Sequence, residues 1–142
     1  MSPVSSKSPL LIILGGLPGS GKTTISRELA AKIGAVYLRI DTIEMAVKNS
    51  SLKVETAEES GYLAATGVAK DNLKLGHTVI VDSVNPIEIS RELYRSAAHS
   101  VGVKFLEVEL FCSDALEHQK RVETRESDLA GQVLPSWQKV QD

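Results

Sequence analysis

The feature that most constrains this chain is a glycine-rich segment at residues 16–23, GLPGSGKT, which has the spacing G-x-x-x-x-G-K-[ST]. The continuous apolar run LLIIL at residues 10–14 precedes it and is typical of a strand buried on both faces of a parallel sheet. After the segment, Ile25, Leu29 and Ile33 recur at four-residue spacing, which predicts a helix. A strand, a glycine-rich loop and a helix in this order form a phosphate-binding loop, the P-loop.

A loop of this kind suits the phosphates of a nucleoside triphosphate. Its glycines let consecutive backbone N–H groups turn toward one anion, and the helix that follows directs its positive end at the same point. Lys22 would reach the β- and γ-phosphates, and the Thr23 hydroxyl would be a magnesium ligand. A glycine-rich turn without a ligand is the alternative, but the strand and helix around the motif favour binding. We therefore expect ATP and Mg²⁺ as cofactors, with the nucleotide bound by Gly16, Leu17, Pro18, Gly19, Ser20, Gly21, Lys22, Thr23 and Thr24.

Apolar runs and helical patterns alternate along the rest of the chain. Strands are predicted at residues 35–40, 78–81 and 103–111, and helices at residues 43–47, 56–75, 85–99 and 114–126. No two strands are separated by a tight hairpin turn, and strands that alternate with helices form a parallel sheet with helices on both faces. The fold class is therefore α/β. We expect one domain over residues 10–142, after a Ser- and Pro-rich disordered tail at residues 1–9.

Composition and charge exclude several classes of protein. A length of 142 residues suits one domain, and 42% hydrophobic residues suffice for a core. The net charge of −2 provides no basic field for nucleic acid or an anionic membrane, and no apolar run approaches the roughly 20 residues of a membrane helix. The single cysteine, Cys112, fits a reducing compartment. We expect a soluble, cytoplasmic protein with a small-molecule partner rather than nucleic acid; the sequence does not indicate the oligomeric state.

Two aspartates follow predicted strands and so reach the edge where ligands of parallel sheets bind. Asp82 ends the strand that begins at Thr78, as a Walker B acid would, and is a candidate magnesium ligand. Asp41 ends the second strand and is a candidate general base for the acceptor hydroxyl. The alternative for each aspartate is a helix N-cap, which is a common use of aspartate at a strand-to-helix junction.

Arg121 and Arg125 are four residues apart and would share one face of a helix. Two guanidinium groups over a triphosphate would neutralise the charge that develops during phosphoryl transfer. The alternative is a solvent-exposed charged face, with Glu117 as an ordinary salt-bridge partner of Arg121. The residues alone favour that alternative.

Taken together, these segments resemble a family of small P-loop kinases, which includes adenylylsulfate kinases, gluconate kinases, chloramphenicol phosphotransferases, zeta-type toxin kinases and polynucleotide 5′-kinases. The similar segments are GLPGSGKTT at residues 16–24, LRIDTIE at 38–44 and RVETR at 121–125. The resemblance implies a three-layer α/β/α sandwich with strand order 2-3-1-4-5. It also implies that Asp41 is the catalytic base, that Arg121 and Arg125 belong to a lid at about residues 114–134, and that Arg39 contacts the acceptor.

The resemblance predicts a phosphotransferase that moves the γ-phosphate of MgATP to a hydroxyl group of a small molecule, with adenylylsulfate as one possible acceptor. The alternatives are a nucleotide-dependent switch that hydrolyses ATP slowly, and a 5′-hydroxyl polynucleotide kinase. Relatives continue past the lid into a fifth strand, whereas this sequence stops at Asp142. We therefore expect the last strand to be missing, either because the chain is truncated or because the fold has four strands.

Overall fold

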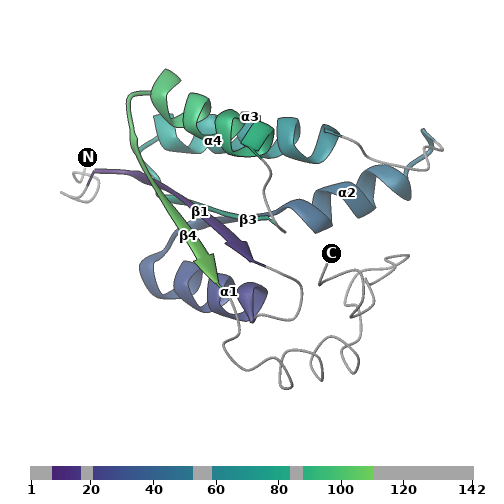
Figure 1. Ribbon diagram of the computed structural model, residues 1–142, viewed down its shortest axis with the longest axis horizontal. Coiled ribbons are helices and arrows are strands. Elements are labelled where there is room, and N and C mark those ends of the chain that lie inside the picture. Colours follow the sequence, from purple (N-terminus) through teal and green to yellow (C-terminus); the bar gives the residue numbers. More distant parts are fainter. Residues whose placement is uncertain (1–7, 17–20, 53–58, 84–87, 111–142) are drawn as a thin grey trace.

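The computed structural model describes residues 8–16, 21–52, 59–83 and 88–110. Within them, strands and helices alternate as the sequence predicts, and Figure 1 shows helices on both sides of one sheet. The elements, in chain order, are β1 (Leu10–Gly16), α1 (Lys22–Ile33), β2 (Val36–Arg39), α2 (Ile40–Lys48), α3 (Ser60–Lys74), β3 (Val79–Asp82), α4 (Glu88–Ser100) and β4 (Lys104–Leu110).

All strand pairs in the sheet are parallel, and the order is β2-β3-β1-β4. This order confirms the α/β fold class and agrees with the first four strands of the expected order. Asp82 pairs with Leu14 of β1 on one side and with Arg39 of β2 on the other. The carboxyl ends of β1, β2 and β3 therefore meet at one edge of the sheet. Most of the predicted tail, the predicted lid at residues 114–134 and any later strand lie outside the described residues.

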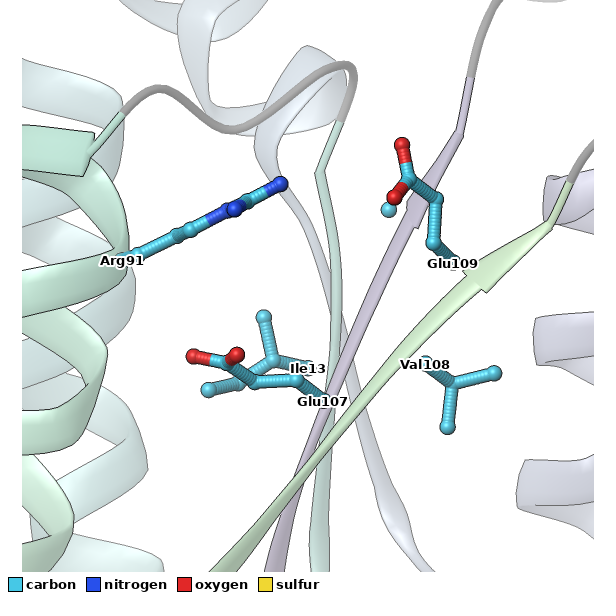
Figure 2. Close-up of a pocket in the computed structure, with 6 residues that line it drawn as sticks. Ile13, Arg91, Glu107, Val108 and Glu109 are labelled. Atoms are coloured by element: carbon cyan, nitrogen blue, oxygen red, sulfur yellow. The ribbon is translucent and has the colours of Figure 1, made fainter.

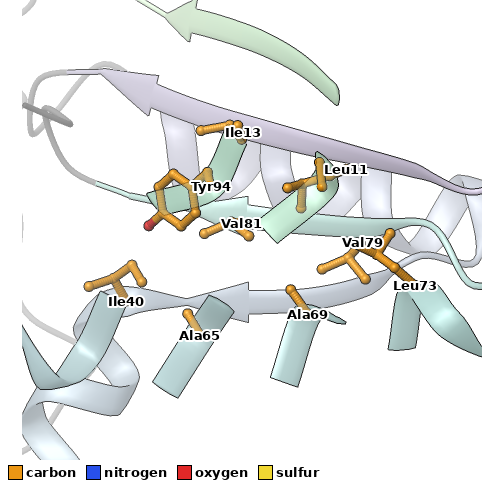
Figure 3. Close-up of a cluster of buried hydrophobic side chains, with 10 residues drawn as sticks. Leu11, Ile13, Ile40, Ala65, Ala69, Leu73, Val79, Val81 and Tyr94 are labelled. Atoms are coloured by element: carbon orange, nitrogen blue, oxygen red, sulfur yellow. The ribbon is translucent and has the colours of Figure 1, made fainter. Parts of the chain in front are cut away.

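The core lies on both faces of the sheet because the side chains of β1 alternate between them. Leu11 and Ile13 face α3 and α4, where they pack with Ala69 and Tyr94 among others (Figure 3). Ile12 and Leu14 face α1, where they pack with Ala30 in a second cluster. This arrangement explains why the β1 sequence is a continuous apolar run rather than an alternating one.

The outer strands are less buried than the inner ones. β2 is half-buried along its whole length, whereas β3 is fully buried. β4 pairs with β1 alone in the part of the sheet that the structure describes, and its Phe105 and Leu106, on opposite faces, are 44% and 49% exposed. No helix in the described ranges is long and apolar enough to cross a membrane.

One predicted boundary is wrong. The sequence predicts a strand at residues 35–40 and a helix from residue 43, but β2 ends at Arg39 and α2 begins at Ile40. Arg39 is extended, with φ −107° and ψ 117°, and it is also the N-cap residue of α2. The chain therefore passes directly from strand to helix, and Asp41 belongs to the first turn of α2.

Candidate active site

The P-loop motif lies where the sequence predicts, between β1 and α1. Gly16 is the last residue of β1, and Gly21 is the N-cap residue of α1. Gly21 has φ 89° and ψ 6°, a left-handed backbone conformation that residues with a Cβ atom rarely adopt. This conformation gives a physical reason for glycine at that position of the motif. Leu17, Pro18, Gly19 and Ser20 lie outside the described residues, as does the side chain of Lys22.

The N-terminus of α1 is suited to an anion. No side chain caps it in the described structure, and its first turn contains no acidic residue. The first N–H groups of a helix have no partner within the helix and carry its positive dipole end. A phosphate group placed there would accept hydrogen bonds from them. Thr24, a predicted nucleotide-binding residue, is exposed in this turn.

Thr23 and Asp82 lie together, as a magnesium site requires. The Thr23 hydroxyl donates a hydrogen bond to Oδ2 of Asp82, with Oγ1 and Oδ2 3.1 Å apart. Asp82 is the last residue of β3, and its side chain is 1% exposed. The contact joins residues 59 positions apart in the chain. It brings the end of the P-loop motif against the proposed Walker B strand.

A third residue, Tyr37 of β2, completes this cluster and is not among the predicted site residues. Its hydroxyl donates a hydrogen bond to the same Oδ2 atom of Asp82, at 2.5 Å. Burial raises the pKa of Tyr37, and the hydrogen bond to Asp82 and its negative charge raise it further. Tyr37 therefore stays protonated and remains a donor. The sequence could have pointed to Tyr37 only through its position in β2, two residues before Arg39, which pairs with Asp82. That position does not reveal that the Tyr37 hydroxyl bonds to Asp82.

The donor atoms of this cluster fit magnesium. Mg²⁺ prefers hard oxygen ligands and is usually held by one or two carboxylates, substrate phosphates and water rather than by a full protein cage. Asp82 and Thr23 supply a carboxylate and a hydroxyl beside the helix end that suits phosphates. Within the described ranges, no group of three or more His, Cys, Asp or Glu side chains could hold a metal ion.

Asp41 reaches the same edge of the sheet from α2. It is half-buried, and the N-cap position of α2 is occupied by Arg39, so the helix-cap alternative does not describe Asp41. Glu44 follows on the same face of α2, three residues later. Burial raises the pKa of Glu44, the negative charge of Asp41 raises it further, and Lys48 lowers it. Two carboxyl groups of α2 therefore share one partly desolvated region.

Of the remaining predicted site residues, the structure describes Arg39 but not the two arginines of the predicted lid. Arg39 is half-buried at the end of β2, opposite Asp82. Arg121 and Arg125 lie outside the described residues. The alternative that they belong to a plain charged face therefore stays open.

A pocket of about 190 Å³ lies beside the carboxyl-terminal half of β1 and β4, lined by Ile13, Gly15, Arg91, Glu107, Val108 and Glu109. Figure 2 shows the Arg91 side chain extending from α4 across this space. Glu107 is held from the same helix by Arg95, whose Nε and Nη2 atoms lie 2.8 and 3.2 Å from its two carboxylate oxygens. The pocket is lined by neither Asp41 nor Asp82, so it is distinct from the cluster around Thr23.

Comparison with known proteins finds one family whose sequence model matches this chain. The sequence model of the AAA_33 family, described as an AAA domain, matches residues 11–138. That range contains the P-loop motif, both aspartates and the two arginines. Among proteins with curated descriptions, none matches this sequence significantly.

Solved structures share the fold at low sequence identity. A putative kinase from Chloroflexus aurantiacus J-10-fl superposes with a TM-score of 0.70 at 20% identity, covering 85% of this chain and 69% of its own. The Mycobacterium tuberculosis APS kinase CysC in complex with AMPPNP and APS superposes with a TM-score of 0.56 at 22% identity, and the match covers 72% of this chain and 62% of that one. A chain of the Pnkp1/Rnl/Hen1 RNA repair complex superposes with a TM-score of 0.69 at 23% identity, and the match covers 96% of this chain and 43% of that one.

Proposed function

This chain belongs to the AAA_33 family and has the fold of the small P-loop kinases, and from that premise we propose that it transfers the γ-phosphate of ATP to a hydroxyl group of a small molecule. The observation that carries the proposal is the hydrogen bond between Thr23 and Asp82. It joins the two residues that a P-loop kinase uses around its metal, at the uncapped N-terminus of α1. ATP as the phosphate donor also fits a cytoplasmic enzyme.

In this proposal the nucleotide phosphates lie at the N-terminus of α1. The backbone N–H groups of the P-loop and the Lys22 ammonium group hold the β- and γ-phosphates. Thr23 and Asp82 would hold magnesium, and the bound ion would supply positive charge against the phosphates. The APS kinase that shares this fold was solved with AMPPNP, a nucleotide, which supports nucleotide binding at this site.

The acceptor would bind on the other side of the γ-phosphate, next to Asp41. Its hydroxyl oxygen attacks the γ-phosphorus, the bond from that phosphorus to the β–γ bridging oxygen breaks, and ADP leaves. The hydroxyl proton passes to the Asp41 carboxylate. Arg39 contacts the acceptor, and Arg121 and Arg125 close over the transferring group and exclude water.

A second candidate is a 5′-hydroxyl polynucleotide kinase. It is favoured by the similarity to a chain of an RNA repair complex, which covers 96% of this protein. The acidic net charge of −2 and the aromatic content of 4% count against a nucleic-acid surface. Phosphorylation of a short 5′-hydroxyl oligonucleotide, strongly weakened by salt, would support this candidate.

The test is acceptor-dependent ATP consumption by the full chain and by Lys22→Ala. We expect at least one hydroxyl acceptor to stimulate turnover, and Lys22→Ala to lower the rate by at least about 100-fold because a cation on the transferred phosphate is lost. Lys32→Ala is the matched control, since Lys32 is an exposed lysine in the last turn of the same helix. Full activity of Lys22→Ala, or no stimulation by any acceptor, contradicts the proposed transfer.

A further inference from the structure

The pocket between α4 and the carboxyl-terminal half of β1 and β4 is a cavity of ligand size that lies apart from the Thr23–Asp82 cluster. Its volume is about 190 Å³. An apolar cavity of about 150 Å³ in another protein holds benzene, whereas sites for drug-sized ligands have about 300–1,000 Å³. The pocket therefore has room for a molecule slightly larger than benzene and is too small for a nucleoside triphosphate.

Four charged side chains gather at this pocket from two elements. Arg91 and Arg95 are four residues apart on α4, so they share one face of that helix. Glu107 pairs with Ile13 of β1, which faces α4, and Glu109, two residues later on β4, shares that face of the sheet. The helix and the strand therefore bring two cations and two anions to one region.

Two of these charges are already paired within the protein. The Nε and Nη2 atoms of Arg95 donate to separate carboxylate oxygens of Glu107, at 2.8 and 3.2 Å. The Nη1 atom of Arg95 donates to Glu92 at 2.9 Å. A two-pronged contact of this kind is among the stronger ion pairs that proteins form. The charge of Glu107 therefore needs no partner from a ligand.

The other two charges, on Arg91 and Glu109, are not paired with each other. Both residues line the pocket, and among the described residues neither one has a hydrogen bond or an ion pair. Arg91 is half-buried, and Figure 2 shows its side chain reaching from α4 toward the strands, while Glu109 lies on β4. A partly buried guanidinium group that gives up water costs free energy unless a partner replaces that water. A ligand in the pocket would supply this partner.

We propose that this pocket binds a small zwitterion of the size of an amino acid, with its carboxylate at Arg91 and its ammonium group at Glu109. The inference does not depend on the proposed kinase function. The planar guanidinium group of arginine binds a carboxylate through two parallel hydrogen bonds, and the Glu109 carboxylate accepts hydrogen bonds from an ammonium group. An anion without an ammonium group would meet the like charge of Glu109, and a cation without a carboxylate would meet that of Arg91. A neutral molecule with separated charges therefore matches the pocket.

Binding of free amino acids to the full chain tests the ligand class. Isothermal titration calorimetry is run with the common α-amino acids that have uncharged side chains, and with β-alanine and 4-aminobutanoate, whose two charges are farther apart. We expect at least one of them to bind. Its N-acetylated derivative keeps only the carboxylate and its amidated derivative keeps only the ammonium group, so each should bind at least about tenfold more weakly. Binding of none of these amino acids, or equal binding of either derivative, overturns the inference.

Single substitutions test the two residues. Arg91→Gln and Glu109→Gln are each expected to weaken binding of that amino acid at least about tenfold, because each removes one charge that the ligand meets. Lys104→Gln is the matched control for the loss of a positive charge, since Lys104 pairs with Leu10 and lies on the face of β4 toward α1. ATP affinity should be unchanged in all three variants. Unweakened amino-acid binding in Arg91→Gln or Glu109→Gln, or loss of ATP binding in Arg91→Gln, contradicts the assignment.

Discussion

Tyr37 of β2 donates a hydrogen bond to Oδ2 of Asp82, the oxygen that also accepts from Thr23. The two donors approach the carboxylate from different elements, one from the strand beside β3 and one from the start of α1. Together they fix the orientation of a side chain that is 1% exposed. We therefore propose that Tyr37 positions Asp82, the predicted metal ligand, and is not a ligand itself.

Removing the Tyr37 hydroxyl should weaken magnesium binding. We expect Tyr37→Phe to raise the magnesium concentration needed for half-maximal ATP binding by about tenfold, as loss of a partner behind a metal ligand typically does. The measurement is nucleotide binding as a function of magnesium concentration. Tyr62→Phe is the control, since it removes a tyrosine hydroxyl from α3 rather than the one bonded to Asp82. An equal effect in both variants, or none in Tyr37→Phe, contradicts the assignment.

Asp41→Asn should separate chemistry from nucleotide binding. The amide keeps the size of the side chain but cannot take the acceptor proton, so we expect acceptor-dependent turnover to fall roughly 100-fold. The affinity for ATP should be unchanged because Asp41 lies on α2 rather than at the P-loop. Single-turnover phosphoryl transfer alongside ATP binding makes the distinction, and a parallel loss of both would show that Asp41 has a structural role.

Two glycines of α3 should respond in opposite directions to alanine. Gly61→Ala places a Cβ atom 2.7 Å from Cγ of Glu44, so we expect a loss of about 1–3 kcal/mol in unfolding free energy as α2 and α3 move apart. Gly67→Ala meets no atom within 4 Å and should stabilise the helix by about 0.5–1 kcal/mol. Urea denaturation of both variants tests this pair, and equal shifts would refute the close packing of Glu44.

The raised pKa of Glu44 predicts that the stability of the folded protein depends on pH. Burial, followed by the charge of Asp41, raises the pKa of Glu44 above its ordinary value of 4.5, so the folded protein holds this proton more tightly than the unfolded chain does. The stabilisation that this proton gives the folded protein is fully present below pH 4.5 and is lost as the pH rises through the folded-state pKa of Glu44. Glu44→Gln removes this dependence. The stability of the variant relative to the unsubstituted protein should therefore increase as pH rises from that value, as measured by urea denaturation; a constant difference would argue against a raised pKa.

The local order of the fold could be predicted because it depends on patterns within short segments. The apolar run before Gly16 and the four-residue spacing after Lys22 are sufficient for β1 and α1, and the strand at Val79–Asp82 follows from its composition. Asp82 lies next to Thr23 because parallel strands bring their carboxyl ends to one edge of the sheet. Its role as a ligand stays a prediction.

The partners of the site residues could not be predicted in this way. Tyr37 lies 45 residues from Asp82, and nothing in the β2 segment indicates which strand packs beside it. The start of α2 was misplaced because Asp41 is a typical N-cap residue, which favours a helix start after it. The N-cap residue is instead Arg39, and no described side chain caps the helix.

The uneven burial of the strands has a consequence for local unfolding. β2 is half-buried, whereas β3 is fully buried, so β2 has less packing to hold it when the sheet opens transiently. Fraying of β2 would release Tyr37 from Asp82 while Thr23, on α1, keeps its contact. Amide hydrogen exchange in β2 would then report how often the carboxylate loses the hydrogen bond from Tyr37, at an opening free energy below that of global unfolding.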